Sequence, residues 1–198
     1  MPKNIQRLHV IYIPGIGDAN PTSQIWAVSK WKYWGVDSEL LQMNWHDNEP
    51  WPKKLDKITA RIDRLKSESK LVALVGASAG ASAAINAYAA RKDDVIGLVT
   101  IAGKINNPQS IGPRYRQNNP AFVESAYQCE QSLKKLNEAD LKKVLCRYAV
   151  FDEVIARQDS VIQGAKNQMI PTLGHAITIA IQITLGAPSF IRFLKKQV

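Results

Sequence analysis

The stretch that decides the fold is LVALVGASAG, residues 71–80. Its first five residues are apolar, as expected for a strand buried on both faces of a parallel sheet. Gly76 and Gly80 flank Ser78, and an alanine-rich segment follows that predicts a helix to about residue 91. A serine on a tight strand-to-helix turn needs small neighbours two residues away. The pattern favours Ser78 as a nucleophile; the alternative is a small-residue turn that only lets strand and helix pack closely.

Strand and helix patterns alternate along the rest of the chain. Apolar runs predict further strands at residues 8–13, 39–45, 95–102, 144–151 and 166–171. Helices are predicted at residues 23–34, 51–67, about 121–136 and 176–196, the last one bent near Gly186. This alternation predicts an α/β fold, a three-layer α/β/α sandwich around a mostly parallel six-stranded sheet. In such sheets the loops after the strands gather the functional residues at one edge.

A serine hydroxyl needs a base, and the chain has only three histidines. His9 lies inside the first predicted strand and is interpreted as a packing residue. His46 follows the second predicted strand, at the surface or the rim of a pocket. His175 follows the last predicted strand where a helix begins, on the same sheet edge as Ser78. We therefore expect His175 to be the base.

The carboxylate that orients this base is expected directly after the strand at residues 144–151. Asp152 stands at that position. Glu153 and Asp159 remain alternatives, because an acidic residue after a strand is often only a loop residue. The candidate nucleophile, carboxylate and base therefore follow one another along the chain in the order Ser, Asp, His, which is one of the orders known for such triads.

Developing negative charge on a reacting carbonyl oxygen requires two hydrogen-bond donors. One is expected to be the backbone N–H of Ala79, directly after Ser78. The second is expected from the loop PGIGD, residues 14–18, where the N–H of Ile16 is the choice.

The same loop could also bind a dinucleotide phosphate, but G-x-G-x-x-G would need glycine at position 20, which is Asn20. The two cysteines, Cys129 and Cys146, have no histidine near them in sequence, so no metal spacing is present. We expect neither cofactor nor metal.

The five tryptophans all lie within residues 26–51. Core packing of the first helix and the second strand explains most of them. Trp45 and Trp51 flank a loop at the carboxyl end of a strand, so these two are the candidate substrate-binding residues.

The order of elements and the three candidate side chains resemble the α/β-hydrolase superfamily in a minimal six-stranded form. More narrowly, residues 13–15, Trp26, residues 35–36, 44–45 and 50–51 and the Ser78 turn resemble small serine hydrolases of the retinoblastoma-binding-protein type. The resemblance implies a catalytic triad of Ser78, Asp152 and His175. The chain departs from that family at Ala77, where His is common, and at Ala79, where Leu or Met is common. A length of 198 residues predicts a single domain over residues 1–198. The resemblance implies that residues 103–143 form a short cap-like insertion, which leaves the pocket accessible.

These observations predict a serine hydrolase that cleaves a carboxylic ester or activated amide through an acyl-enzyme on Ser78. The alternative is a catalytically silent α/β-hydrolase relative that acts as a protein-interaction module. The expected partner is a small-molecule ester or amide substrate. The sequence leaves acyl length, oligomeric state and physiological role open.

The net charge and the cysteine content limit which partners and which cellular location we expect. The chain carries 26 Lys and Arg against 17 Asp and Glu, a net charge of +9. The basic residues are spread along the chain without a nucleic-acid-binding motif, so nucleic acid is not the expected partner. Two cysteines are too few for a disulfide scaffold, which favours a reducing, cytoplasmic location. The uncharged stretch at residues 167–191 is interrupted by glycine and proline and is a poor membrane span.

Overall fold

A six-stranded sheet, with all strands parallel, forms the centre of the computed structural model, which describes residues 6–198. The strand order is β2-β1-β3-β4-β5-β6. The strands are β1 (Leu8–Ile13), β2 (Asp37–Leu40), β3 (Leu71–Ala77), β4 (Val95–Ile101), β5 (Val144–Phe151) and β6 (Lys166–Leu173).

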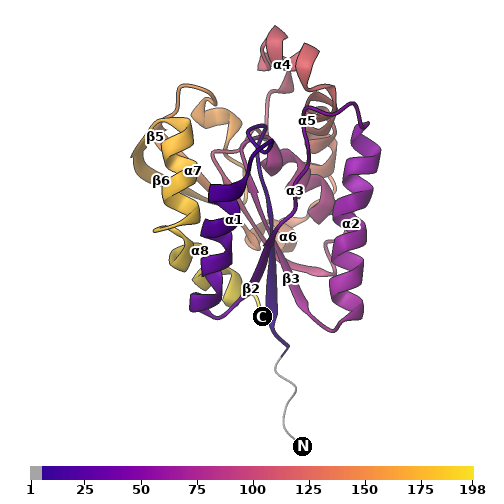
Figure 1. Cartoon of the computed structure of the whole chain (residues 1–198), viewed down its shortest axis with the longest axis vertical. Coiled ribbons are helices and arrows are strands. Elements are labelled where there is room, and N and C mark those ends of the chain that lie inside the picture. Colours follow the sequence, from indigo (N-terminus) through magenta and orange to yellow (C-terminus); the bar gives the residue numbers. More distant parts are fainter. Residues whose placement is uncertain (1–5) are drawn as a thin grey trace, which may run out of the picture.

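Helices cover both faces of this sheet (Figure 1). One face packs against α1 (Thr22–Ser29), the 3-10 helix η1 (Lys30–Trp34), α7 (His175–Ile183) and α8 (Ala187–Lys195). The other face packs against α2 (Trp51–Ser67), α3 (Ala79–Ala90) and α5 (Pro120–Leu133). The predicted three-layer α/β/α sandwich is therefore confirmed, and the sheet is parallel throughout.

Strand β3 shows how one segment serves both layers. Val72 and Leu74 belong to the core under α2, α3 and α5, whereas Ala73 and Val75 belong to the core under α1, α7 and α8. All four are fully buried, because successive side chains of a central parallel strand point into opposite layers. The position of β3 at the middle of the sheet places its carboxyl end, and Ser78 after it, between the two layers of helices.

The second strand differs from the prediction of residues 39–45, because β2 ends at Leu40. The backbone N–H groups of Met43 and Asn44 are both 2.7 Å from Oδ2 of the buried Asp18, so they are satisfied by a side chain instead of a neighbouring strand. Asn44 has a positive φ of 52°, which extended strands do not adopt. Met43 and Trp45 therefore belong to a loop, which places their side chains in the core.

Two of the predicted helices are each divided into two parts in the structure. The predicted helix 23–34 is divided into α1 and η1. The last helix is broken between α7 and α8, which meet at an angle of 60°. The guanidinium of Arg147 lies at this break, with Nη1 2.6 Å from the Gln182 side chain and 3.1 Å from the carbonyl of Gly186. The bend predicted at Gly186 is confirmed.

The segment at residues 103–143 divides into two parts. Its second part belongs to the helical layer, since α5 packs along α3 and Asn86 donates a hydrogen bond of 2.9 Å to the carbonyl of Ser125. Its first part contains η2 (Pro108–Ser110) and α4 (Pro113–Asn118), and α4 stands at the top of Figure 1 beyond the sheet edge. The first part therefore stands beyond the carboxyl edge of the sheet. The remaining short helices are α6 (Glu138–Lys142) and η3 (Arg157–Asp159).

Within residues 6–198, no single helix has both the length and the apolar composition to cross a bilayer. The bent pair α7 and α8 reaches both criteria only when the two helices are taken together.

Candidate active site

Ser78 occupies a strained turn between β3 and α3. Its backbone angles are φ 53° and ψ −121°, a region that residues with a Cβ rarely adopt. The neighbours hold this conformation: the N–H of Ser78 donates to Ile101 at 3.0 Å, and its carbonyl accepts from Lys104 at 3.2 Å. A Cβ on Gly76 would collide with the Gly80 carbonyl oxygen, and a Cβ on Gly80 would collide with that of Ile13. The two glycines therefore allow strand, turn and helix to approach closely enough to present the Ser78 hydroxyl.

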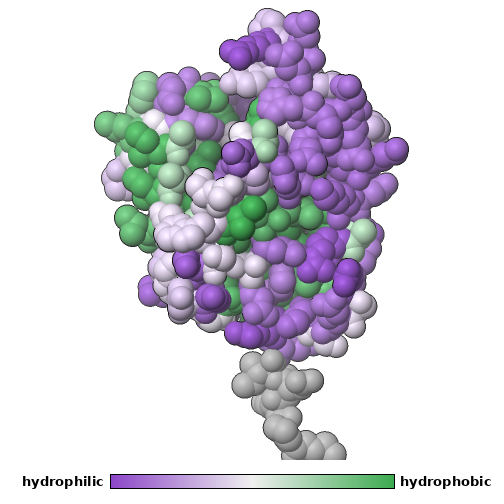
Figure 2. All heavy atoms as spheres, in the orientation of Figure 1, coloured by the Kyte–Doolittle hydropathy of each residue, from purple (hydrophilic) through white to green (hydrophobic). Residues whose placement is uncertain are grey.

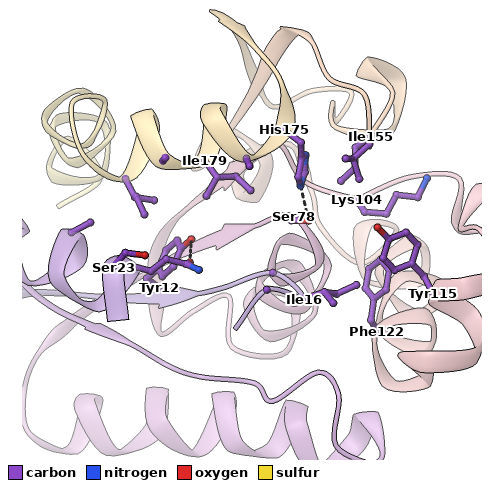
Figure 3. Close-up of a pocket in the computed structure, with 18 of the residues that line it drawn as sticks. Tyr12, Ile16, Ser23, Ser78, Lys104, Tyr115, Phe122, Ile155, His175 and Ile179 are labelled. Atoms are coloured by element: carbon purple, nitrogen blue, oxygen red, sulfur yellow. Dashed lines mark hydrogen bonds between the residues drawn. The ribbon is translucent and has the colours of Figure 1, made fainter. Parts of the chain in front are cut away.

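His175 is the first residue of α7, and its ring meets Ser78 across the sheet edge (Figure 3). The Nε2 atom lies 2.9 Å from Ser78 Oγ, and the Nδ1 atom lies 2.8 Å from Asp152 Oδ2. Gly174 precedes it with φ 96°, a left-handed conformation that lets the chain turn from β6 into α7. The structure thus brings the three predicted side chains into one continuous hydrogen-bond chain.

Asp152 is held so that one oxygen remains for the histidine. Its Oδ1 accepts hydrogen bonds from the N–H groups of Val154 at 2.9 Å and Ile155 at 2.8 Å. Burial raises the pKa of this carboxyl, but the hydrogen bonds from His175 and from the two N–H groups outweigh burial and lower the pKa below its ordinary value. An ionised Asp152 accepts a hydrogen bond from Nδ1–H, which leaves the lone pair of Nε2 facing the Ser78 hydroxyl.

The two alternative carboxylates are engaged elsewhere. Glu153 accepts from the backbone N–H of His175 at 3.0 Å, so it caps α7 instead of contacting the imidazole ring. Asp159 is buried and pairs with the ammonium of Lys104, which also donates to Ser110 Oγ at 2.6 Å. This ion pair ties the loop after β4 to η3. Sequence reasoning missed it, because no pattern in the chain connects a lysine and an aspartate 55 residues apart.

The loop expected to supply the second donor lies against Ser78. A Cβ on Gly15 would be 2.7 Å from Ser78 Cβ and 3.2 Å from Ser78 Oγ, so only glycine allows this approach. The next residue, Ile16, lines the cavity beside Ser78 (Figure 3). Ala79 is the first residue of α3, and the N–H groups of a first helical turn have no acceptor within the helix. Both residues predicted to supply the backbone donors therefore lie next in sequence to a residue at the site: Ala79 follows Ser78, and Ile16 follows Gly15.

His46 supports this loop instead of acting as the base. Its Nε2 lies 3.1 Å from the carbonyl oxygen of Ile16, and its Nδ1 lies 3.2 Å from Nδ2 of the buried Asn119. Because the amide of Asn119 donates to Nδ1, Nε2 carries the proton and donates to Ile16. The third histidine, His9, lies within β1 with Nε2 3.4 Å from Glu39, away from the site.

A cavity of about 660 Å³ opens over Ser78 and His175. Figure 3 shows it extending to both sides of the pair: Tyr12, Ser23 and Ile179 on one side, and Lys104, Tyr115, Phe122 and Ile155 on the other. Most of the lining is apolar, and exposed apolar side chains continue around α7. Figure 2 shows this apolar surface in green on the left of the molecule; its members include Phe151, Leu173, Ile177 and Leu185. The site is therefore suited to a substrate with substantial apolar surface.

The interpretation of Trp45 and Trp51 as pocket residues is wrong. Both are buried in the core, with their rings stacked 6.4 Å apart, and the Trp45 ring packs edge-on against Phe122. The loop at residues 41–50 turns the Trp45 ring inward, and its Nε1 donates to the carbonyl of Pro14 at 3.0 Å. The tryptophan that lines the cavity is Trp26 on α1, which is 60% exposed.

Across the described part of the chain, no group of three or more His, Cys, Asp or Glu side chains could hold a metal ion.

No protein-family model matches the sequence, and no curated protein matches it. Solved structures do. Est1E from Butyrivibrio proteoclasticus superimposes with a TM-score of 0.71 at 20% identity, covering 100% of this chain and 91% of that one. A carboxylesterase structure from the thaumarchaeon Nitrososphaera gargenis gives 0.71 at 12% identity, covering 97% and 92%. A structure of the metagenome-derived lipolytic enzymes LipS and LipT gives 0.69 at 11% identity, covering 96% and 94%.

This chain has the α/β-hydrolase fold. The predicted α/β-hydrolase fold is thereby confirmed, and membership of the superfamily stays a prediction. The narrower resemblance to the retinoblastoma-binding-protein type stays a prediction.

Proposed function

We propose that the chain is a serine hydrolase that cleaves a carboxylic ester or an activated amide through an acyl-enzyme on Ser78. The observation that carries this proposal is the hydrogen-bond chain from Asp152 through His175 to Ser78, at the wall of an apolar cavity. The same chemistry recurs on unrelated folds wherever a serine, an imidazole and a carboxylate are arranged in this way. Structural neighbours that are described as carboxylesterases and lipolytic enzymes agree with it.

In the first half-reaction, Ser78 Oγ attacks the substrate carbonyl carbon while His175 Nε2 takes the hydroxyl proton. The carbonyl oxygen becomes an oxyanion, which the N–H groups of Ile16 and Ala79 stabilise. The resulting imidazolium is stabilised by the ionised Asp152. His175 then transfers the proton to the departing alkoxide or amine. The alcohol or amine leaves the site, and the acyl group remains bound to Ser78 as an ester.

The second half-reaction repeats these roles with water. His175 takes a proton from the attacking water, the acid forms, and Ser78 leaves with the proton returned by His175. The first part of the segment at residues 103–143, with η2 and α4, acts as a small cap, since Tyr115 of α4 lines the cavity. We place the enzyme in the reducing cytoplasm, because Cys129 and Cys146 are free and buried.

The test uses a fluorophosphonate probe and a panel of p-nitrophenyl esters from acetate to palmitate, with aminoacyl arylamides beside it. The proposal expects covalent labelling that Ser78→Ala abolishes, together with turnover of at least one ester. A wild-type protein that neither labels nor hydrolyses any substrate would support a silent relative that acts as an interaction module.

A further inference from the structure

The part of the cavity between α1 and α7 is here called the α1–α7 arm. Its walls include Ala27 from α1, Ile179 and Ala180 from α7, and Tyr12 near the end of β1. Figure 3 shows Tyr12, Ser23 and Ile179 on this side of the Ser78–His175 pair, opposite Tyr115 and Phe122. The small side chains of Ala27 and Ala180 leave space between the two helices, so the arm can accept one chain of a bound substrate.

One polar pair interrupts this apolar arm. The side chain of Tyr12 is completely buried, and its hydroxyl donates a hydrogen bond of 2.9 Å to Oε1 of the half-buried Gln24. Burial raises the pKa of Tyr12, which keeps the phenol protonated as a donor. Gln24 also lines the cavity. Because Oε1 is occupied by Tyr12, the amide presents its Nε2 donors, and these have no hydrogen-bond acceptor among residues 6–198.

An amide donor without an acceptor is unfavourable in an apolar compartment once water is displaced. A substrate chain that brings an acceptor satisfies it, whereas a purely apolar chain leaves it unpaired. The cavity lining contains one lysine, Lys104, which lies on the opposite side, and its ammonium is bound to Asp159 and Ser110. With no cation in the α1–α7 arm, the arm favours a neutral acceptor such as an amide or ester carbonyl over a carboxylate.

We propose that Gln24, oriented by Tyr12, is a specificity-determining residue that selects ester substrates whose chain in the α1–α7 arm carries a neutral hydrogen-bond acceptor. This inference rests on the proposed hydrolase function and names the substrate class of the same site. We expect a preference of about three- to tenfold over the matched alkyl chain, which corresponds to about 0.7–1.4 kcal/mol and lies within the range of a neutral hydrogen bond.

The test compares matched ester pairs that differ only in a terminal amide. On the acyl side these are the p-nitrophenyl esters of hexanoic acid and of 6-amino-6-oxohexanoic acid. On the alcohol side they are the acetates of 1-hexanol and of 6-hydroxyhexanamide. We expect the amide to raise kcat/KM about three- to tenfold in one of the two pairs, and the pair that responds identifies which half of the ester enters the arm.

Two substitutions remove the donors in different ways. Gln24→Leu removes the whole amide, while Gln24→Glu keeps an oxygen that can accept from Tyr12 and replaces the NH2 group with a carboxylate oxygen. Both should bring the ratio of kcat/KM between amide and alkyl ester to about one, whereas a merely structural role would be rescued by Glu. Gln131→Leu makes the same chemical change on the exposed surface of α5 and should leave the ratio unaltered. Thermal melting of each variant separates loss of folding from loss of preference.

A binding measurement keeps the inference independent of turnover. In a Ser78→Ala background, titration calorimetry with methyl 6-amino-6-oxohexanoate and methyl hexanoate measures the same preference on intact esters. Tighter binding of the amide, lost with Gln24→Glu, supports the inference even if the wild-type protein hydrolyses nothing, in which case only the proposed function fails. Equal binding and equal turnover of both members of every pair would overturn it.

Discussion

The imidazole Nε2 of His175 lies 2.9 Å from the hydroxyl of Ser78, although 97 residues separate them in the chain. The contact exists because β3 and β6 end at the same edge of the sheet, and the residues that follow each strand begin the helices α3 and α7. It therefore depends on the parallel topology as a whole. The consequences of this contact and of its supports can be tested separately.

Ser78→Ala should abolish ester hydrolysis and leave stability almost unchanged. The alanine keeps the Cβ at the strained φ of Ser78 and removes only the hydroxyl, so the free energy of unfolding should change by no more than about 0.5 kcal/mol. We expect kcat to fall by at least about a thousandfold, because the covalent step is lost. Steady-state kinetics and thermal melting measure both effects. Substantial residual activity would mean that another group is the nucleophile.

Asp152→Asn and Glu153→Gln separate the role of the ring contact from that of the helix cap. Asp152 contacts the imidazole, so its replacement should favour the wrong tautomer and lower kcat by roughly a thousandfold or more. Glu153 contacts only the backbone N–H of His175, so Glu153→Gln should cost less than about tenfold in kcat, in keeping with the modest effect of a helix cap. Equal losses in the two variants would contradict this division of roles.

Gly80→Ala, at the Ser78 turn, and Gly17→Ala, in the loop after β1, form a matched pair. A Cβ on Gly80 would collide with the Ile13 carbonyl oxygen and lie 2.6 Å from that of Pro14, and backbone atoms cannot move aside cheaply. We expect destabilisation by about 1–3 kcal/mol or more and loss of activity. Nothing lies within 4 Å of a Cβ on Gly17, so its replacement should be tolerated. Urea denaturation of both variants measures the difference.

The buried pair of Lys104 and Asp159 should show strong coupling in a double-mutant cycle. Lys104→Met leaves the Asp159 charge buried without a partner, at a cost of about 3–5 kcal/mol. The double variant Lys104→Met with Asp159→Leu should regain most of that stability, because neither charge remains buried. Additive single and double effects would show that the two side chains do not stabilise each other.

Stability at low pH should depend on Glu39. Burial raises its pKa, but His9 and Arg61 outweigh burial and bring the pKa from 4.5 to about 2. Because the folded state favours the ionised carboxylate, its contribution is present above pH 4.5 and is lost as the pH falls toward 2. Glu39→Gln should therefore be less stable than wild type at neutral pH, and the gap should shrink between about pH 4.5 and 2. A constant gap in urea denaturation across that range would exclude this linkage.

The sequence alone determined the fold class and the edge at which the candidate site lies. Local patterns were sufficient for β1, α2 and β5, whose bounds agree with those predicted. Burial on both faces of a central strand leaves a continuous apolar run, and burial on one face of a helix leaves a helical periodicity. The Gly-x-Ser-x-Gly turn was also readable, since its backbone requires small residues at fixed positions. Ser78, Asp152 and His175 follow from this, because parallel strands place their carboxyl ends together.

Only the tertiary structure decided which side chains face the cavity and which pair beneath it. Trp45 and Trp51 were misplaced because a loop held by the Asp18 carboxylate, distant in sequence, turns the Trp45 ring into the core. The ion pair of Lys104 with Asp159 left no periodic pattern either. Both depend on hydrogen bonds between segments far apart in the chain. Periodicity reports how each residue lies relative to its own strand or helix, whereas these contacts form only when separate segments meet.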